Sequence, residues 1–181
     1  MQPMKVLVTW LEKFADSEHY LFTLNDLRAL FPALSHSAFK TLLSRVVGAG
    51  YLGRVCRGLY IYKPFSSSGL VLFHAAALLR ANEFNYISLE TALSDAGVIS
   101  QIPINWISIM SSGRSNVVSC GVFGTIEFVH TNQKPDRIMQ QLHYDAKCKH
   151  WRATVSLALR DMRAARRDCD LINWDVVNEL I

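Results

Sequence analysis

The side chains of this chain that are best suited to binding chemistry are lysines and arginines within one acid-free stretch. No aspartate or glutamate lies between Asp26 and Glu83. Residues 1–64 contain eight Lys or Arg and four acids, whereas residues 65–181 contain eleven of each. A one-sign stretch of this length focuses a positive potential on part of the surface, which favours a polyanionic partner over a merely solvated basic face. The cations of this stretch are Arg28, Lys40, Arg45, Arg54, Arg57, Lys63 and Arg80.

Three helices are expected to position the first of these cations. Apolar residues at helical spacing predict helices over residues 4–15, 24–31 and 38–47. Thr23 and Ser35 stand where the N-caps of the second and third helices are expected. The cations of the third helix fall between its apolar positions, so they would share a polar face.

A β-hairpin is expected over residues 51–62, where a short strand, a turn and a second strand precede Lys63. Helix, helix, turn, helix and hairpin is the order of a winged helix-turn-helix, a DNA-binding module. The sequence therefore predicts an α+β protein in which residues 1–64 form an N-terminal winged helix-turn-helix.

In that module the third helix presents its polar face to the major groove. The arginines of the hairpin would meet phosphates or the adjacent minor groove. Ser35 has a second interpretation as a plain N-cap. Tyr51, Tyr60 and Tyr62 are expected to pack against the core rather than stack on bases. The predicted DNA-binding residues are Ser35, His36, Ser37, Lys40, Thr41, Arg45, Arg54, Arg57 and Lys63.

A second domain is expected after the linker-like residues 65–69, which read Phe-Ser-Ser-Ser-Gly. Residues 70–181 are expected to form a small mixed α/β domain. Its expected elements are helices over 70–81 and 88–96, β-structure over 102–110, a hairpin over 117–130 that turns near Gly121–Gly124, and helical structure from Pro135 onward.

Arginines of the second domain leave two questions open. Arg114, with Ser115 beside it, could contact an anion or the DNA backbone, or Arg114 could pair with Glu127 or Asp95 to hold the sheet. A cluster of arginines near the C-terminus is interleaved with aspartates, which favours ion pairs within one helix. A second DNA or RNA surface is the alternative. That cluster is Arg160, Arg163, Arg166 and Arg167, interleaved with Asp161, Asp168 and Asp170.

Cysteines and histidines form no recognisable chemical site. The four cysteines contain no C-x-x-C pair. Cys148 and His150, with His143 and Cys169, match no standard zinc spacing. They also lack the oriented third group that nucleophilic catalysis requires. We therefore expect no metal, no cofactor and no enzymatic activity.

The apolar residues are distributed as in a globular protein. No run reaches the ~18 apolar residues that a membrane helix needs. The N-terminal residues are not followed by the apolar run of a signal peptide. The expectation is a cytoplasmic protein with reduced thiols and no membrane partner.

Several segments of the chain, in order, resemble the AbiEi-type antitoxins of abortive-infection, type IV toxin–antitoxin systems. The resemblance covers nearly the whole chain, and the ordered set is more specific than any single motif. The N-terminal part of the match runs from Phe22-Thr23-Leu24 through Gly50-Tyr51-Leu52 to Arg57-Gly58-Leu59-Tyr60. The later segments are Tyr86–Leu93, Ser112-Gly113-Arg114-Ser115, Phe123–Phe128, Ala153–Met162 and Ile172-Asn173-Trp174-Asp175.

The resemblance implies a sequence-specific transcriptional repressor that acts as the antitoxin of such a system, in phage defence, and autoregulates its operon. It implies double-stranded DNA of its own promoter as partner, and a functional link to a nucleotidyltransferase-like toxin without a stable complex. Inverted-repeat operators would imply a homodimer on DNA. Two alternatives remain: a regulator of phage-defence or mobile-element genes without antitoxin activity, and a protein-interaction module that docks a toxin.

Overall fold

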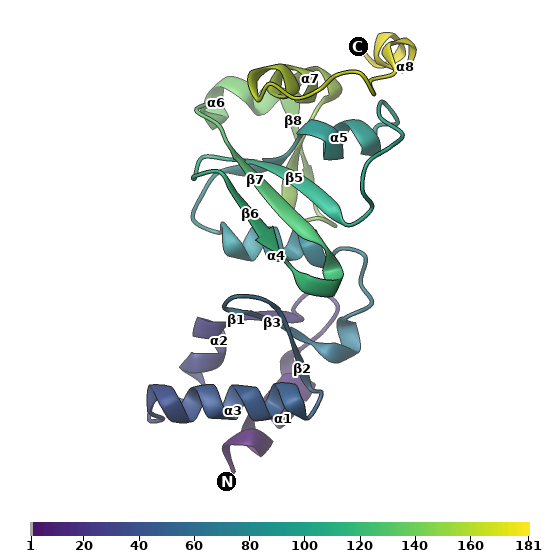
Figure 1. Cartoon of the computed structure of the whole chain (residues 1–181). Coiled ribbons are helices and arrows are strands. Elements are labelled where there is room, and N and C mark those ends of the chain that lie inside the picture. Colours follow the sequence, from purple (N-terminus) through teal and green to yellow (C-terminus); the bar gives the residue numbers. More distant parts are fainter. Residues whose placement is uncertain (1) are drawn as a thin grey trace. The chain divides into compact units, whose positions relative to one another are not determined.

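A computed structural model describes residues 2–181, which form two compact units (Figure 1). Unit 1 extends to Val71, and unit 2 begins at Leu72. The fold is mixed α and β, with one sheet in each unit. Among the described residues, no helix has both the length and the apolar character needed to cross a membrane.

Unit 1 contains the expected helices and hairpin, together with one strand that was not expected. That strand, β1, pairs antiparallel with β3, with Leu21 opposite Ile61. The result is a three-stranded sheet in the order β1-β3-β2. The elements are α1 (Pro3–Phe14), β1 (Leu21–Thr23), α2 (Leu24–Ala29), α3 (His36–Gly48), β2 (Leu52–Cys56), β3 (Leu59–Tyr62) and the 3-10 turn η1 (Lys63–Phe65).

Side-chain caps fix where α2 and α3 begin. The Thr23 hydroxyl accepts from the backbone N–H of Asp26 at 3.2 Å, and the Asp26 carboxylate accepts from the backbone N–H of Thr23 at 2.7 Å. This reciprocal pair is a capping box. The Ser35 hydroxyl accepts from the backbone N–H of Ala38 at 3.2 Å, which confirms its interpretation as an N-cap. Both helix starts are therefore encoded locally.

Unit 2 is built on a six-stranded mixed sheet in the order β6-β7-β5-β4-β9-β8. The expected hairpin over 117–130 is confirmed as β6 and β7 with a turn between them. The elements are α4 (Val71–Leu79), β4 (Asn85–Ile87), α5 (Leu89–Asp95), β5 (Trp106–Ser111), β6 (Asn116–Ser119), η2 (Gly121–Phe123), β7 (Thr125–His130), α6 (Pro135–Ile138), η3 (Met139–Gln141), β8 (Leu142–Asp145), β9 (His150–Ala153), α7 (Val155–Ala164) and α8 (Trp174–Leu180).

The expectation of helical structure throughout the region after Pro135 is wrong. Two of its segments are the strands β8 and β9, and β9 lies inside the sheet between β4 and β8. Tyr86 and Trp151 pair across the parallel β4–β9 contact. A four-residue strand shows too little periodicity to be recognised alone, because its register is set by a partner far away in sequence. The β-structure expected from Ile102 likewise begins only at Trp106.

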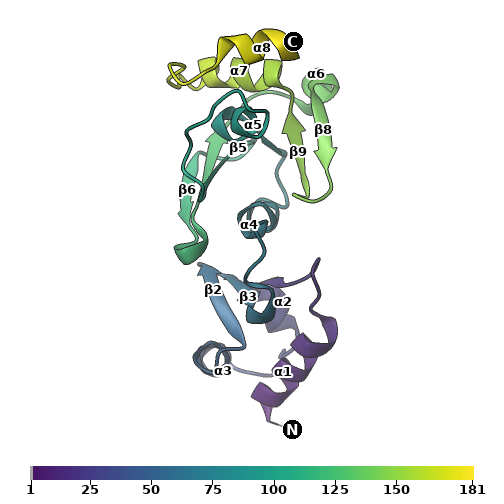
Figure 2. The same ribbon diagram turned by 90° about the vertical axis from the view of Figure 1, so that its right-hand side faces the viewer.

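Helices cover both faces of the unit 2 sheet. Side chains alternate along β7, so Glu127 and Phe128 point to opposite faces. The Arg80 guanidinium, just after α4, lies 4.5 Å from the centroid of the Phe128 ring. Arg167, just after α7, donates to Glu127. Figures 1 and 2 show the same division, with α5 and α7 together and α4 apart from them.

Contrary to expectation, no ion pair among the described residues joins an arginine of the cluster Arg160–Arg167 to an acid of its own helix. Asp161 is fully buried and accepts hydrogen bonds from Ser88 at 2.7 Å and from Tyr86 and Gln133 at 3.0 Å. Burial raises the pKa of the Asp161 carboxyl. Arg167 turns to the sheet and binds Glu127 instead of a helix neighbour. Both residues tie α7 to the rest of unit 2, a role that linear spacing does not reveal.

Candidate nucleic-acid interface

One face of α3 carries the predicted recognition residues. The opposite face packs into the core of unit 1 through Phe39, Leu42, Leu43 and Val46. An α-helix with this apolar stripe must turn the residues between those positions to solvent. The structure exposes all of the predicted ones: Ser35, His36, Ser37, Lys40, Thr41 and Arg45.

The hydroxyls on this face are partly engaged. Thr41 donates to the backbone carbonyl of Ser37 at 3.1 Å, and the Ser35 and Ser37 hydroxyls lie 3.2 Å apart. Ser35 is further committed to the helix cap. Lys40 and Arg45 are therefore the strongest anion-binding groups that α3 presents, because their cationic heads remain exposed.

The hairpin approaches α3 and completes a groove with it. β2 and β3 are joined by a tight turn at Gly58, where φ is +79°, and the backbone N–H of Leu24 donates to the Gly58 carbonyl at 2.8 Å. This bond ties the turn to the start of α2. The groove has a volume of about 790 Å³. Its polar lining includes His36, Lys40, Arg54 and Arg57, all exposed, and no acid.

The structure thus brings together four of the nine predicted residues in one groove. Arg45 stays on the exposed face of α3, and Lys63 follows β3 at the beginning of η1, so neither lines the groove. Among the described residues, no ion pair involves any of these cations. A surface with several uncompensated cations and no carboxylate attracts an extended polyanion.

The tyrosines of the hairpin behave largely as expected. Tyr62 is buried in the core cluster of unit 1, and Tyr60 packs against that cluster. Tyr51 is 38% exposed. The expectation of packing is therefore confirmed for Tyr60 and Tyr62, while Tyr51 lies at the surface.

Arg28 has a role that its place in the acid-free stretch does not reveal. Its guanidinium donates to the Phe31 carbonyl at 2.9 Å and to the Leu34 carbonyl, and it lies 5.1 Å from the centroid of the Phe39 ring. These contacts hold the turn between α2 and α3 and join it to α3. The sequence signal was available: an arginine in the last turn of a helix is well placed to bind the carbonyls that follow it.

We expect Arg28→Met to destabilise unit 1 by about 2 kcal/mol, because it removes charged hydrogen bonds from two carbonyls. Denaturant unfolding followed by circular dichroism measures the change. Arg45→Met is the matched control, because Arg45 is exposed and the variant loses only a solvated head group. Its free energy of unfolding should fall by less than about 0.5 kcal/mol. Equal costs for the two variants would contradict the assigned role of Arg28.

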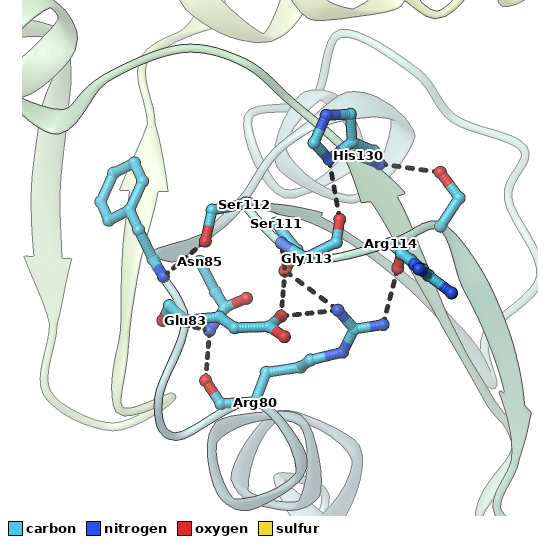
Figure 3. A network of polar contacts seen from close by, with 10 residues as sticks. Arg80, Glu83, Asn85, Ser111, Ser112, Gly113, Arg114 and His130 are labelled. Carbon is cyan, nitrogen blue, oxygen red and sulfur yellow. Dashed lines mark hydrogen bonds and ion pairs between the residues drawn. The ribbon is translucent and has the colours of Figure 1, made fainter.

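The turn that contains Arg114 is shaped by a polar network in unit 2 (Figure 3). Arg80 donates to Glu83 at 2.6 Å and to the backbone carbonyl of Arg114 at 2.7 Å. The hydrogen bond from Arg80 lowers the pKa of Glu83. The Ser111 hydroxyl also donates to Glu83, at 3.0 Å. This network fixes the backbone of the turn and was not anticipated, because its members come from separate strands and loops.

The prediction that Arg114 pairs with Glu127 or Asp95 to hold the sheet is wrong. Asp95 accepts from Arg152, and Glu127 accepts from Arg167, so both proposed carboxylate partners are bound to other arginines. Arg114 contributes its backbone to the network and is exposed. Ser115 accepts from the backbone N–H of His130 at 2.9 Å. A contact of Arg114 with an anion remains a prediction.

The cysteine and histidine group near residue 150 is engaged in packing and hydrogen bonds. His150 Nε2 lies 2.9 Å from the Phe73 carbonyl, and Arg152 lies 3.6 Å from the Cys148 sulfur. Burial raises the pKa of the Cys148 thiol to about 11, which keeps it protonated at neutral pH. A protonated thiol is a poor nucleophile.

The chain matches no protein-family model, and no curated protein matches it in sequence.

Proposed function

We propose that unit 1 is a winged helix-turn-helix that binds double-stranded DNA, with α3 in the major groove and the β2–β3 hairpin beside it. The observation that carries this proposal is the acid-free groove between α3 and the hairpin, lined by His36, Lys40, Arg54 and Arg57. The element order helix, strand, helix, helix and hairpin supports the same arrangement.

The proposed interface has the donors that DNA recognition needs. Arginine and lysine bind phosphates and the O6 and N7 acceptors of guanine, and an exposed helix face fits the width of the major groove. Lys40 and Arg45 lie one helical turn or more from the N-cap on that face, and Arg54 and Arg57 extend the cationic surface onto the hairpin. Direct base contact would come from α3, while the hairpin would hold the backbone.

We further propose that the protein represses its own operon as the antitoxin of a type IV toxin–antitoxin system. The resemblance of its ordered segments to AbiEi-type antitoxins supports this part. Growth after co-expression with a nucleotidyltransferase-like toxin encoded beside it would test it: rescue of growth is expected. Unrelieved toxicity, with DNA binding intact, would leave a transcriptional regulator without antitoxin activity.

Salt-dependent binding to the DNA upstream of the gene tests the DNA-binding proposal. If only Arg54 and Arg57 neutralise a phosphate each, log K falls with log salt with a slope of about −1.8 per bound copy, and the slope steepens to about −3.6 if Lys40 and Arg45 also each neutralise one. Fluorescence anisotropy with a labelled duplex, between about 50 and 200 mM salt, measures this slope. An unrelated duplex of the same length is the control and should bind at least about tenfold more weakly at the higher salt.

Two outcomes would contradict the proposal. Absence of binding at low salt, together with a stable co-purifying protein, would instead support a protein-interaction module. Equal binding of the two duplexes at every salt concentration would reduce the function to sequence-independent binding.

A further inference from the structure

Unit 2 contains a pocket that is lined by residues of this unit alone. Its volume is about 360 Å³, which is within the range of sites for small ligands. It is lined by residues of α5, the loop before β5, β5, β7 and the segment after α7. It therefore lies on the α5 and α7 side of the sheet, where Glu127 points.

The charges in this pocket are not balanced. Glu90 and Glu127 share one guanidinium, that of Arg167. Arg167 binds Glu127 closely, whereas its Nε stays 3.7 Å from the nearer oxygen of Glu90. The other oxygen of Glu90, Oε2, is buried, and no described residue donates a hydrogen bond to it. Asp168 adds a further carboxylate to the lining.

Glu127 has little capacity left for a ligand. It accepts from the Ser108 hydroxyl at 3.1 Å and from the Trp106 indole N–H at 3.4 Å, in addition to Arg167. Glu90 is different, because its side chain is 29% exposed and its one ion pair among the described residues is the long contact with Arg167. An under-compensated carboxylate beside a low-dielectric wall favours a cation.

The rest of the lining is mainly apolar. Ile99, Ile102, Pro103 and Leu171 contribute aliphatic surface, and the Trp106 side chain contributes an aromatic one. Trp106 lines the pocket and is 36% exposed, so part of its ring is accessible to a ligand. A flat aromatic ring packs favourably against an indole. An apolar wall with one indole and with two carboxylates, Glu90 and Asp168, that no close ion pair among the described residues neutralises fits a flat apolar body that carries a positive charge.

We propose that this pocket binds a small organic cation with a flat apolar body, of the arylamidine or arylamine class. The cationic group lies beside Glu90, and the ring packs against Trp106 and the aliphatic wall. This proposal is independent of the DNA-binding function of unit 1, and the two can fail separately.

Titration calorimetry with benzamidine, on the full-length protein, tests the proposal. Benzamide is the matched neutral ligand, with the same ring and nearly the same shape, and benzoate is the anionic one. We expect benzamidine to bind at least about tenfold more tightly than benzamide, because only benzamidine compensates the carboxylate. Benzoate should give no measurable heat. Equal binding of benzamidine and benzamide, or no benzamidine binding up to about 10 mM, would overturn the proposal.

Variants locate the binding. Glu90→Gln keeps the size of the side chain and removes its charge, so it should weaken benzamidine binding about tenfold or more. Asp136→Asn removes one exposed acid of α6 outside the pocket and should leave binding unchanged. Trp106→Leu should weaken binding several-fold, which gives a second readout if Glu90→Gln does not fold. Unchanged binding in both folded pocket variants would place the ligand elsewhere and overturn the assignment.

Discussion

The double variant Lys40→Glu/Arg45→Glu is expected to lose DNA binding by about 100-fold or more. Each reversal removes a cation from the exposed face of α3 and places a carboxylate against the phosphate backbone or the bases. Losing one such contact costs about 1–3 kcal/mol, and reversal adds repulsion. Two changes therefore exceed the roughly 2.8 kcal/mol that corresponds to 100-fold in affinity. Anisotropy with the upstream duplex at moderate salt measures the loss.

A matched pair of reversals separates this interface from overall charge. Lys5→Glu/Lys13→Glu makes the same change in net charge on the exposed surface of α1, within the same unit. It should weaken binding only slightly, through the longer-range potential. Circular dichroism must show that both proteins keep their helices. An equal loss in the two variants would sink the assignment of α3 as the recognition helix and leave a diffuse electrostatic attraction.

Gly124→Ala is expected to destabilise unit 2 by about 3–5 kcal/mol or to prevent its folding. Gly124 has φ +118° and ψ −146°, a region of backbone conformation that is essentially reserved for glycine. A Cβ at this position would lie 2.1 Å from the backbone oxygen of Asn105. That oxygen cannot move away easily, because it accepts from the backbone N–H of Thr125 at 2.8 Å. Denaturant unfolding followed by tryptophan fluorescence measures the loss.

Gly121→Ala is the internal control for this prediction. Gly121 lies three residues earlier in the same turn with φ +58°, and no atom lies within 4 Å of a Cβ built on it. The change therefore introduces the left-handed backbone cost alone, about 1 kcal/mol. A similar cost for the two variants would show that the contact with Asn105 contributes nothing.

The sequence alone was sufficient to predict those elements whose structure is decided by residues close together in the chain. The starts of α2 and α3 follow from Thr23 and Ser35, whose hydroxyls cap the backbone within three residues. The exposed face of α3 follows from its apolar stripe. The hairpin over 51–62 and the turn before β7 were predictable, because glycines mark the tight turns.

Elements that depend on distant partners were missed. β1 and β4 are three residues long, and each is a strand only because another strand pairs with it. β8 and β9 were mistaken for helix for the same reason. Short segments have nearly equal local preferences for several structures, so tertiary pairing decides among them.

The cations of the acid-free stretch between Asp26 and Glu83 show the same division. The sequence alone determined that the stretch contains seven cations and no acid, and the helical spacing determined that Lys40 and Arg45 both lie outside the apolar stripe of α3. Only the tertiary structure decided that Arg54 and Arg57 line one groove with Lys40, while Arg28 binds the carbonyls of a turn and Arg80 binds Glu83 in unit 2. Composition fixes the charge of a segment, but the direction in which each cation points depends on which carbonyls, carboxylates and apolar surfaces the fold places within its reach.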